Sequence, residues 1–134
     1  MKNKLTYIID DDKLSARLMT ILLAKNNFSD QIESFSNALN ALENLRENVR
    51  NKADLPDIIL LDLNMPMMDG WQFLDEFMLL PLLKEVHVFI MTSSIDPADI
   101  EKSKKYAVVR LYVDKPITVK KLELMQEIID LHQF

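Results

Sequence analysis

Apolar and polar positions follow two alternating periods along this 134-residue chain. Short apolar runs, which indicate buried strands, occur at residues 5–9, 31–35, 58–61, 86–91 and 108–113. Between them apolar residues recur at helical spacing, as Leu14, Leu18 and Ile21 do, in segments 13–27, 38–49, 70–78, a short one that begins at 96–97, and 118–132. The run at 31–35 is the most polar and is expected at a sheet edge. The chain should therefore fold as five successive strand–helix units.

That order of elements predicts an α/β fold. Five such units build a parallel sheet with right-handed crossovers and with helices on both of its faces. A doubly wound five-stranded sheet of this kind has the strand order 2-1-3-4-5 and a binding crevice between its first and third strands. The four branched aliphatic residues at 58–61 fit a strand that is buried on both faces.

Several residues are expected to shape the ends of these elements. Asp12, Asn37 and Thr118 are suited to cap the first, second and fifth helices. Pro97 fits the first turn of the fourth helix. Gly70, the only glycine, is expected to supply a positive φ angle in the turn that precedes the third helix.

Composition narrows the classes of protein that this fold can serve. At 134 residues the chain is one ordinary domain, and without cysteine it has neither disulfides nor thiolate metal sites. The apolar runs are too short to span a membrane and the first residues do not resemble a signal peptide, so a cytoplasmic location is expected. The net charge of −5 argues against a nucleic-acid surface.

Polar residues gather where four of the predicted strands end. The carboxyl ends of parallel strands meet at one edge of the sheet, which is where ligands of such sheets bind. The residues at these ends are Asp10-Asp11-Asp12 after the first strand, Asp62 after the third, Thr92-Ser93-Ser94 after the fourth, and Asp114-Lys115-Pro116 after the fifth. The sequence thus predicts a cluster of acids, one hydroxyl and one amine.

Such a cluster favours one kind of chemistry. Neighbouring carboxylates repel and raise one another's pKa unless a cation lies between them. Oxygen ligands without His or Cys suit a hard divalent ion, Mg²⁺ in particular. A carboxylate such as Asp62 can also attack phosphorus to give an acyl phosphate, while Lys115 and the Thr92 hydroxyl contact the phosphoryl oxygens.

The sequence closely resembles the receiver domain of two-component response regulators, in particular the chemotaxis-regulator-like receivers, over nearly its whole length. The motifs that carry the resemblance are Tyr7-Ile8-Ile9-Asp10-Asp11-Asp12, Ile58 to Gly70 with Asp62 and Asn64-Met65-Pro66, Met91-Thr92-Ser93, and Lys115-Pro116. The resemblance implies a flavodoxin-like (βα)5 fold that accepts a phosphoryl group on Asp62, in the presence of Mg²⁺, from a histidine kinase or a histidine phosphotransfer protein.

The resemblance also implies a role for each matching residue. Asp10 and Asp11 would organise Mg²⁺ together with Asp62 and the backbone carbonyl of Asn64. Lys115 would hold the phosphoryl oxygens and precede a cis peptide bond to Pro116. Thr92 and Tyr112 match the positions that rearrange on phosphorylation.

Two features depart from the family pattern. Ser93 is small but polar where receivers often carry alanine after the switch hydroxyl. Many receivers have a glycine before the fifth strand, whereas this chain has Tyr106-Ala107-Val108-Val109. Asn64 and Ser94 occupy positions that influence the lifetime of the acyl phosphate in the family.

These observations predict a single receiver domain, residues 1–134, with no effector domain and no enzymatic activity of its own. Its output would pass to a downstream protein through the fourth helix, fifth strand and fifth helix, or the phosphoryl group would be handed on. Basic residues on those helices could receive an acidic partner, although such residues usually form solvated helix faces: Lys102, Lys104, Lys105, Lys120 and Lys121. His87 is expected to be a structural residue.

Three other functions remain open. A flavodoxin-like cofactor binder would need hydroxyls and backbone NH groups for the FMN phosphate, and three aspartates in the first loop would repel it. An aspartyl-phosphate phosphohydrolase would need a general acid after the nucleophile, but the residue two positions beyond Asp62 is Asn64. A nonphosphorylated docking module would not need the complete set of acids, hydroxyl and lysine.

Overall fold

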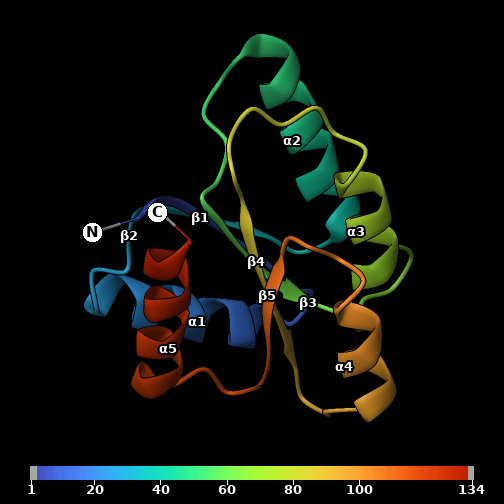
Figure 1. The fold of residues 1–134 in the computed structure, drawn as a ribbon. Coiled ribbons are helices and arrows are strands. Elements are labelled where there is room, and N and C mark those ends of the chain that lie inside the picture. The colour runs from blue at the N-terminus through green and yellow to red at the C-terminus, as the bar shows by residue number, and fades with distance from the viewer. Residues whose placement is uncertain (1–2, 133–134) are drawn as a thin grey trace.

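The computed structural model describes residues 3–132, which form five strands and five helices around one parallel sheet (Figure 1). The strands are β1 (Asn3–Ile9), β2 (Ser29–Phe35), β3 (Ile58–Asp62), β4 (His87–Thr92) and β5 (Val109–Asp114). The helices are α1 (Lys13–Lys25), α2 (Ala38–Asn51), α3 (Gly70–Phe77), α4 (Pro97–Ser103) and α5 (Val119–Leu131). The strand order β2-β1-β3-β4-β5 confirms the predicted doubly wound α/β fold and the edge position of β2.

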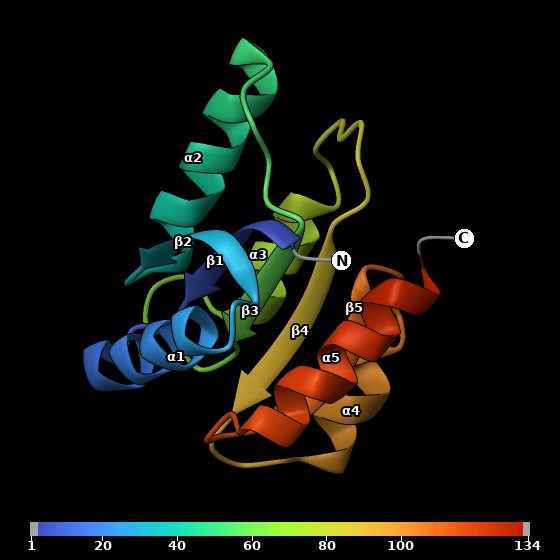
Figure 2. The same ribbon diagram turned by 90° about the vertical axis from the view of Figure 1, so that its left-hand side faces the viewer.

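Two hydrophobic cores lie on opposite faces of the sheet. Alternate residues of β1 point to opposite sides, so that Tyr7 packs toward α2 and α3, and Ile8 packs toward α1 and α5. Figures 1 and 2 show α1 and α5 over one face, and α2, α3 and α4 over the other. Every residue of β3 and β4 is buried, as expected for central strands that helices cover on both sides. Among residues 3–132, no helix is both long and apolar enough to cross a membrane.

The predicted helix caps are confirmed. The Asp12 carboxylate accepts from the backbone NH groups of Leu14 and Ser15. Asn37 and Thr118 accept in the same way at the starts of α2 and α5, and Pro97 lies in the first turn of α4. These side chains satisfy NH groups that the first turn of a helix leaves without partners.

The prediction for Gly70 is wrong. No glycine has a positive φ angle, and in this turn the left-handed residue is Met67, with φ of 68°. Gly70 is needed for space, because a Cβ atom there would lie 2.8 Å from Leu63 Cδ2 and 2.9 Å from the Asp62 carbonyl oxygen. The absent side chain lets α3 begin directly against the end of β3, where the Gly70 NH donates to the Leu63 carbonyl at 2.9 Å.

The connection into β5, where the sequence lacks the expected glycine, is held by Arg110. Its guanidinium donates to the Ala107 carbonyl at 2.7 Å and to His87 Nδ1 at 3.0 Å, and it also pairs with Glu85. His87 is buried, and its pKa is lowered by burial and by the nearby Arg110 charge. This confirms the expected structural role of His87, since its neutral ring accepts a hydrogen bond inside the fold.

Candidate functional site

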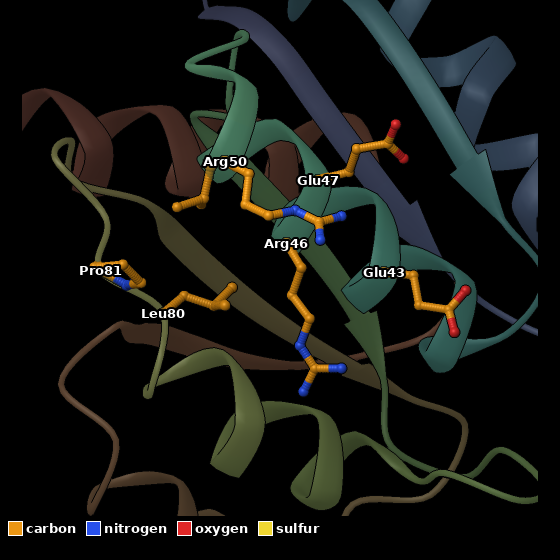
Figure 3. Close-up of a pocket in the computed structure, with 7 residues that line it drawn as sticks. Glu43, Arg46, Glu47, Arg50, Leu80 and Pro81 are labelled. Atoms are coloured by element: carbon orange, nitrogen blue, oxygen red, sulfur yellow. The ribbon is translucent and has the colours of Figure 1, made fainter.

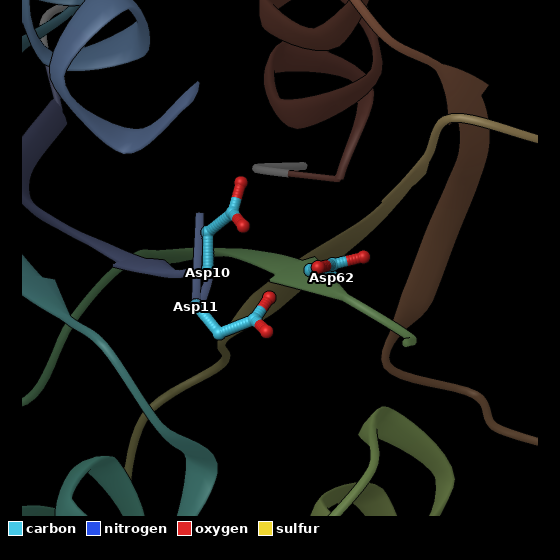
Figure 4. Close-up of side chains that lie close together, drawn as sticks. All are labelled: Asp10, Asp11 and Asp62. Atoms are coloured by element: carbon cyan, nitrogen blue, oxygen red, sulfur yellow. The ribbon is translucent and has the colours of Figure 1, made fainter. Parts of the chain in front are cut away.

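The ends of β1 and β3 bring three carboxylates together. Asp10 and Asp11 directly follow β1, and Asp62 is the last residue of β3 (Figure 4). One carboxylate oxygen from each lies within 4.8 Å of the others. Asp10 and Asp62 are buried, with exposed fractions of 1% and 6%, whereas Asp11 is open to solvent. The acidic cluster predicted from the sequence is therefore formed, with one open side.

Lys115 is the cation that faces this cluster. Its Nζ lies 2.7 Å from Asp10 Oδ2 and 3.8 Å from Asp62 Oδ2. Its backbone NH donates to the Thr92 carbonyl at 2.7 Å, which ties the loop after β5 to the end of β4. The peptide bond between Lys115 and Pro116 is cis, as predicted. Lys115 thus reaches two of the three acids from the far side of the crevice.

The electrostatics of Asp62 reflect this crowding. Burial raises its pKa to about 6, although the Lys115 charge and a hydrogen bond from the backbone NH of Asn64, at 3.3 Å, act to lower it. Asp10 and Asp11 contribute further to the rise because their negative charges oppose ionisation of a third carboxylate. One ammonium group does not balance three acids, so the site favours an additional cation.

The donor set fits a hard divalent ion. The ligands available are carboxylate oxygens, with neither sulfur nor imidazole among them. Oxygen-only sites of this kind suit Mg²⁺, which keeps several of its own waters and binds through one to three protein groups. Asn64 lies two positions beyond Asp62 in this loop, and the use of its backbone carbonyl as a ligand stays a prediction.

Of the two proposed switch residues, Thr92 lies at the strand end next to the cluster, and Tyr112 lies on β5 opposite Ile90. Asp62 pairs with Met91 across the sheet, so that Thr92 follows at the end of β4, where its hydroxyl donates to the Ser94 carbonyl at 3.0 Å. The buried Tyr112 hydroxyl has no hydrogen-bond partner of normal geometry within residues 3–132. Burial raises the Tyr112 pKa, and the negative charge of Asp99 raises it further. Both hydroxyls are therefore held inside the fold, and their switching role stays a prediction.

A hollow next to Lys115 was not foreseen from the sequence. It measures about 490 Å³ and lies between α1 and the loop after β5, with Leu14, Leu18, Pro116 and Ile117 in its lining. Leu14 and Leu18 are 67% and 57% exposed, because α1 turns Ala16, Met19 and Leu23 toward the sheet instead. The sequence signal was present: α1 carries two apolar stripes where one would suffice to bury it.

Comparisons with known proteins agree with this fold and site. The family model of the response regulator receiver domain matches residues 6–128. The two-component response regulator ARR10 of Arabidopsis thaliana is 31% identical over 115 residues, which are 86% of this chain and 19% of ARR10. This chain thus spans about a fifth of that plant protein.

Two solved structures are similar along almost their whole length. A two-component response regulator from Cytophaga hutchinsonii is 29% identical, with a TM-score of 0.86 over 97% of this chain and 99% of that one. The phosphorylated cyanobacterial phytochrome response regulator RcpA is 30% identical, with a TM-score of 0.73 over 98% of this chain and 92% of that one. With the family match across residues 6–128 and the acidic site at the strand ends, these findings show that the chain belongs to the response regulator receiver domain family.

Proposed function

We propose that Asp62 accepts a phosphoryl group from a phosphohistidine on a sensor histidine kinase or a histidine phosphotransfer protein. The observation that carries the proposal is the buried Asp62 carboxylate, which is grouped with Asp10 and Asp11 within 4.8 Å and faces Lys115. RcpA, whose structure is of the phosphorylated protein, supports it as a relative. In this proposal the chain acts as one receiver domain.

The reaction is an in-line displacement at phosphorus. A carboxylate oxygen of Asp62 attacks, the new O–P bond forms as the P–N bond breaks, and the imidazole nitrogen leaves with the bonding electron pair. Lys115 and the Thr92 hydroxyl donate to the phosphoryl oxygens, which carry the negative charge. Asp62 must be ionised to attack, and the Lys115 charge and a bound Mg²⁺ would both favour its ionised form.

Receiver domains as a family bind Mg²⁺ at an acidic site. In this chain Asp10, Asp11, Asp62 and the Asn64 carbonyl would hold it, and the bound ion would screen the repulsion between the carboxylates and the incoming phosphoryl group. Asp10 Oδ2 also accepts a hydrogen bond from Lys115 Nζ at 2.7 Å, so this carboxylate positions the lysine as well.

The hollow beside Lys115 is the docking surface that best fits the phosphodonor. The donor must carry its phosphohistidine to the open side of the Asp62 site, and the exposed Leu14 and Leu18 adjoin that opening. All charged residues of α1 are basic, namely Lys13, Arg17 and Lys25. An apolar stripe with a basic border fits a partner helix that has an apolar face and acidic flanks.

The signal then leaves through a different surface. Phosphorylation is proposed to favour a conformer in which Thr92 and Tyr112 move toward the phosphoryl group, which changes the surface of α4, β5 and α5. A downstream protein partner that prefers this conformer would bind there. α4 and α5 carry both basic and acidic side chains, so their charges would orient such a partner without selecting an acidic one.

Mass spectrometry of the intact protein tests the proposal. Incubation with phosphoramidate and Mg²⁺ should add one phosphate to the wild type and none to Asp62→Asn, and EDTA should prevent the addition. Asp114→Asn, an exposed acid on the same sheet edge, serves as the matched control and should react as the wild type does. An adduct that survives in Asp62→Asn, or none in the wild type, would contradict the assignment. Continuous release of phosphate from a generic ester would instead support a phosphohydrolase.

A further inference from the structure

The outer surface of α2 carries charges in an alternating order. Glu43, Arg46, Glu47 and Arg50 are all exposed on the side of the helix that faces away from the sheet, while Leu42 and Leu45 are buried beneath it. Figure 3 shows these four side chains along α2, with Leu80 and Pro81 of the α3–β4 loop across a hollow of about 550 Å³. This charged stretch is called the α2 surface below.

Most of these charges lack a partner within the chain. Arg46 pairs with Glu76 at 3.0 Å, and both side chains are almost half exposed. Within residues 3–132 no ion pair is formed by Glu43, Glu47 or Arg50. On the α2 surface like charges stand four positions apart and opposite charges three positions apart, so their effects within the helix nearly offset one another. An external surface with the opposite pattern would add attraction at each position.

The pattern is self-complementary. If a second α2 lies antiparallel to the first about a two-fold axis between positions 46 and 47, Glu43 of each copy faces Arg50 of the other, and Arg46 faces Glu47. All four charged positions meet the opposite sign in this one register. We propose that the α2 surface binds a second copy of this chain in that arrangement.

The same register also pairs apolar surface. It places Leu39 of one copy, which is 42% exposed, just beyond the last turn of α2 in the other copy, where the chain turns at Lys52 and leads to Asp54. Asp54 borders a second hollow, of about 300 Å³, whose lining includes Leu55, Pro81 and Leu83. Leu83 is 99% exposed and would be covered by this contact. Apolar burial would supply affinity, while the charges would fix the register.

This pairing leaves the acidic site free. Figures 1 and 2 both place α2 away from α4 and α5. Since α2 runs back from the carboxyl ends of the parallel strands, its charged C-terminal half lies away from the edge of the sheet that carries Asp62. Dimerisation through α2 is therefore compatible with phosphorylation and with both surfaces proposed above. It does not depend on whether Asp62 is phosphorylated.

Sedimentation velocity on the full chain tests the pairing. The wild type should shift from monomer to dimer as its concentration rises, and high salt should shift it back because it screens the ion pairs. Reversal of two charges, as R46E/R50E or as E43R/E47R, should weaken the dimer by at least about 100-fold, because four attractive contacts become repulsive. An equimolar mixture of the two variants should associate again, since every facing pair is then opposite in charge.

A matched control separates register from net charge. K105E/K120E makes the same change in net charge as R46E/R50E at exposed positions of another surface, and it should dimerise as the wild type does. Circular dichroism establishes that each variant keeps its helices. A wild type that stays monomeric at several hundred micromolar would overturn the proposal. So would a dimer that survives both double reversals, or two variants that do not associate when mixed.

Discussion

Replacement of Asp62 by asparagine should stabilise the protein in the absence of Mg²⁺. The substitution keeps the size of the side chain and removes a charge that is buried beside Asp10 and Asp11. Because the folded state raises the Asp62 pKa from its ordinary 3.8 to about 6, ionisation of this group opposes folding at neutral pH. A residue that the function requires is therefore expected to cost stability.

The size of the effect follows from the pKa. The difference between 3.8 and about 6 corresponds to about 3 kcal/mol at neutral pH, and screening by solvent at the open side of the site reduces it to about 1–2 kcal/mol. The sign follows from proton binding. Above pH 6 the full cost is present, between pH 6 and 4 it declines as the folded state takes up a proton, and below pH 4 it disappears because both states are protonated.

Urea unfolding at pH 7.5 and at pH 4, with EDTA present, measures this cost. Trp71, the only tryptophan, is half-buried on α3 and stacks on Tyr106 with ring centroids 5.7 Å apart, so its fluorescence reports unfolding. The free energy of unfolding of Asp62→Asn should exceed that of the wild type by about 1–2 kcal/mol at pH 7.5 and by little at pH 4. Asp114→Asn should gain nothing, since Lys121 lowers the pKa of that exposed acid. No gain at pH 7.5, or an equal gain at pH 4, would refute the electrostatic explanation.

Two further predictions concern the loop between Asp62 and α3, and both are read from the same unfolding curves. Gly70→Ala should lower the free energy of unfolding by about 1–3 kcal/mol, although alanine favours helices, because its Cβ would lie 2.9 Å from the Asp62 carbonyl oxygen. Unchanged stability would show that the end of β3 shifts to make room. Met67→Gly should raise the free energy of unfolding by about 0.5 kcal/mol, since a φ angle of 68° strains a residue that has a side chain. The same change at Met78, where φ is −65°, should instead lose about 0.5–1 kcal/mol, and a gain at both positions would contradict the role of φ.

The sequence predicted the site because strand ends are strongly determined. A short run of branched aliphatic residues such as 58–61, between turn residues and in an alternating order of elements, indicates a buried strand. Asp62 then lies at its end, where the parallel topology brings it to Asp10 and Lys115. The Gly70 prediction failed for a different reason. Turn residues suggest a positive φ angle for glycine, but the close approach of α3 to β3 depends on three-dimensional packing that local sequence does not record.

The outer surfaces of the helices were also beyond the sequence pattern. Helical spacing shows that Leu14 and Leu18 share one face of α1, but it does not show that Met19 and Leu23, on another face, are the residues that pack against the sheet. The charge order on α2 can likewise be read from the sequence. Its meaning depends on which side of the helix is exposed and on the hollow beside Leu80 and Pro81.

The position of Lys115 links the cation to the phosphoryl group. Its ammonium lies 2.7 Å from Asp10 but 3.8 Å from Asp62, so without a divalent ion it is held mainly by the acid that does not react. A cation bound by Asp10 and Asp11 would weaken that hold and make Lys115 available to phosphoryl oxygens on Asp62. By thermodynamic linkage the phosphoryl group must then strengthen cation binding by the same factor. Asp10→Asn leaves Asp62 and Asp11 in place. It should therefore reduce the factor by which phosphorylation strengthens Mg²⁺ binding by more than it reduces the Mg²⁺ affinity of the unphosphorylated protein.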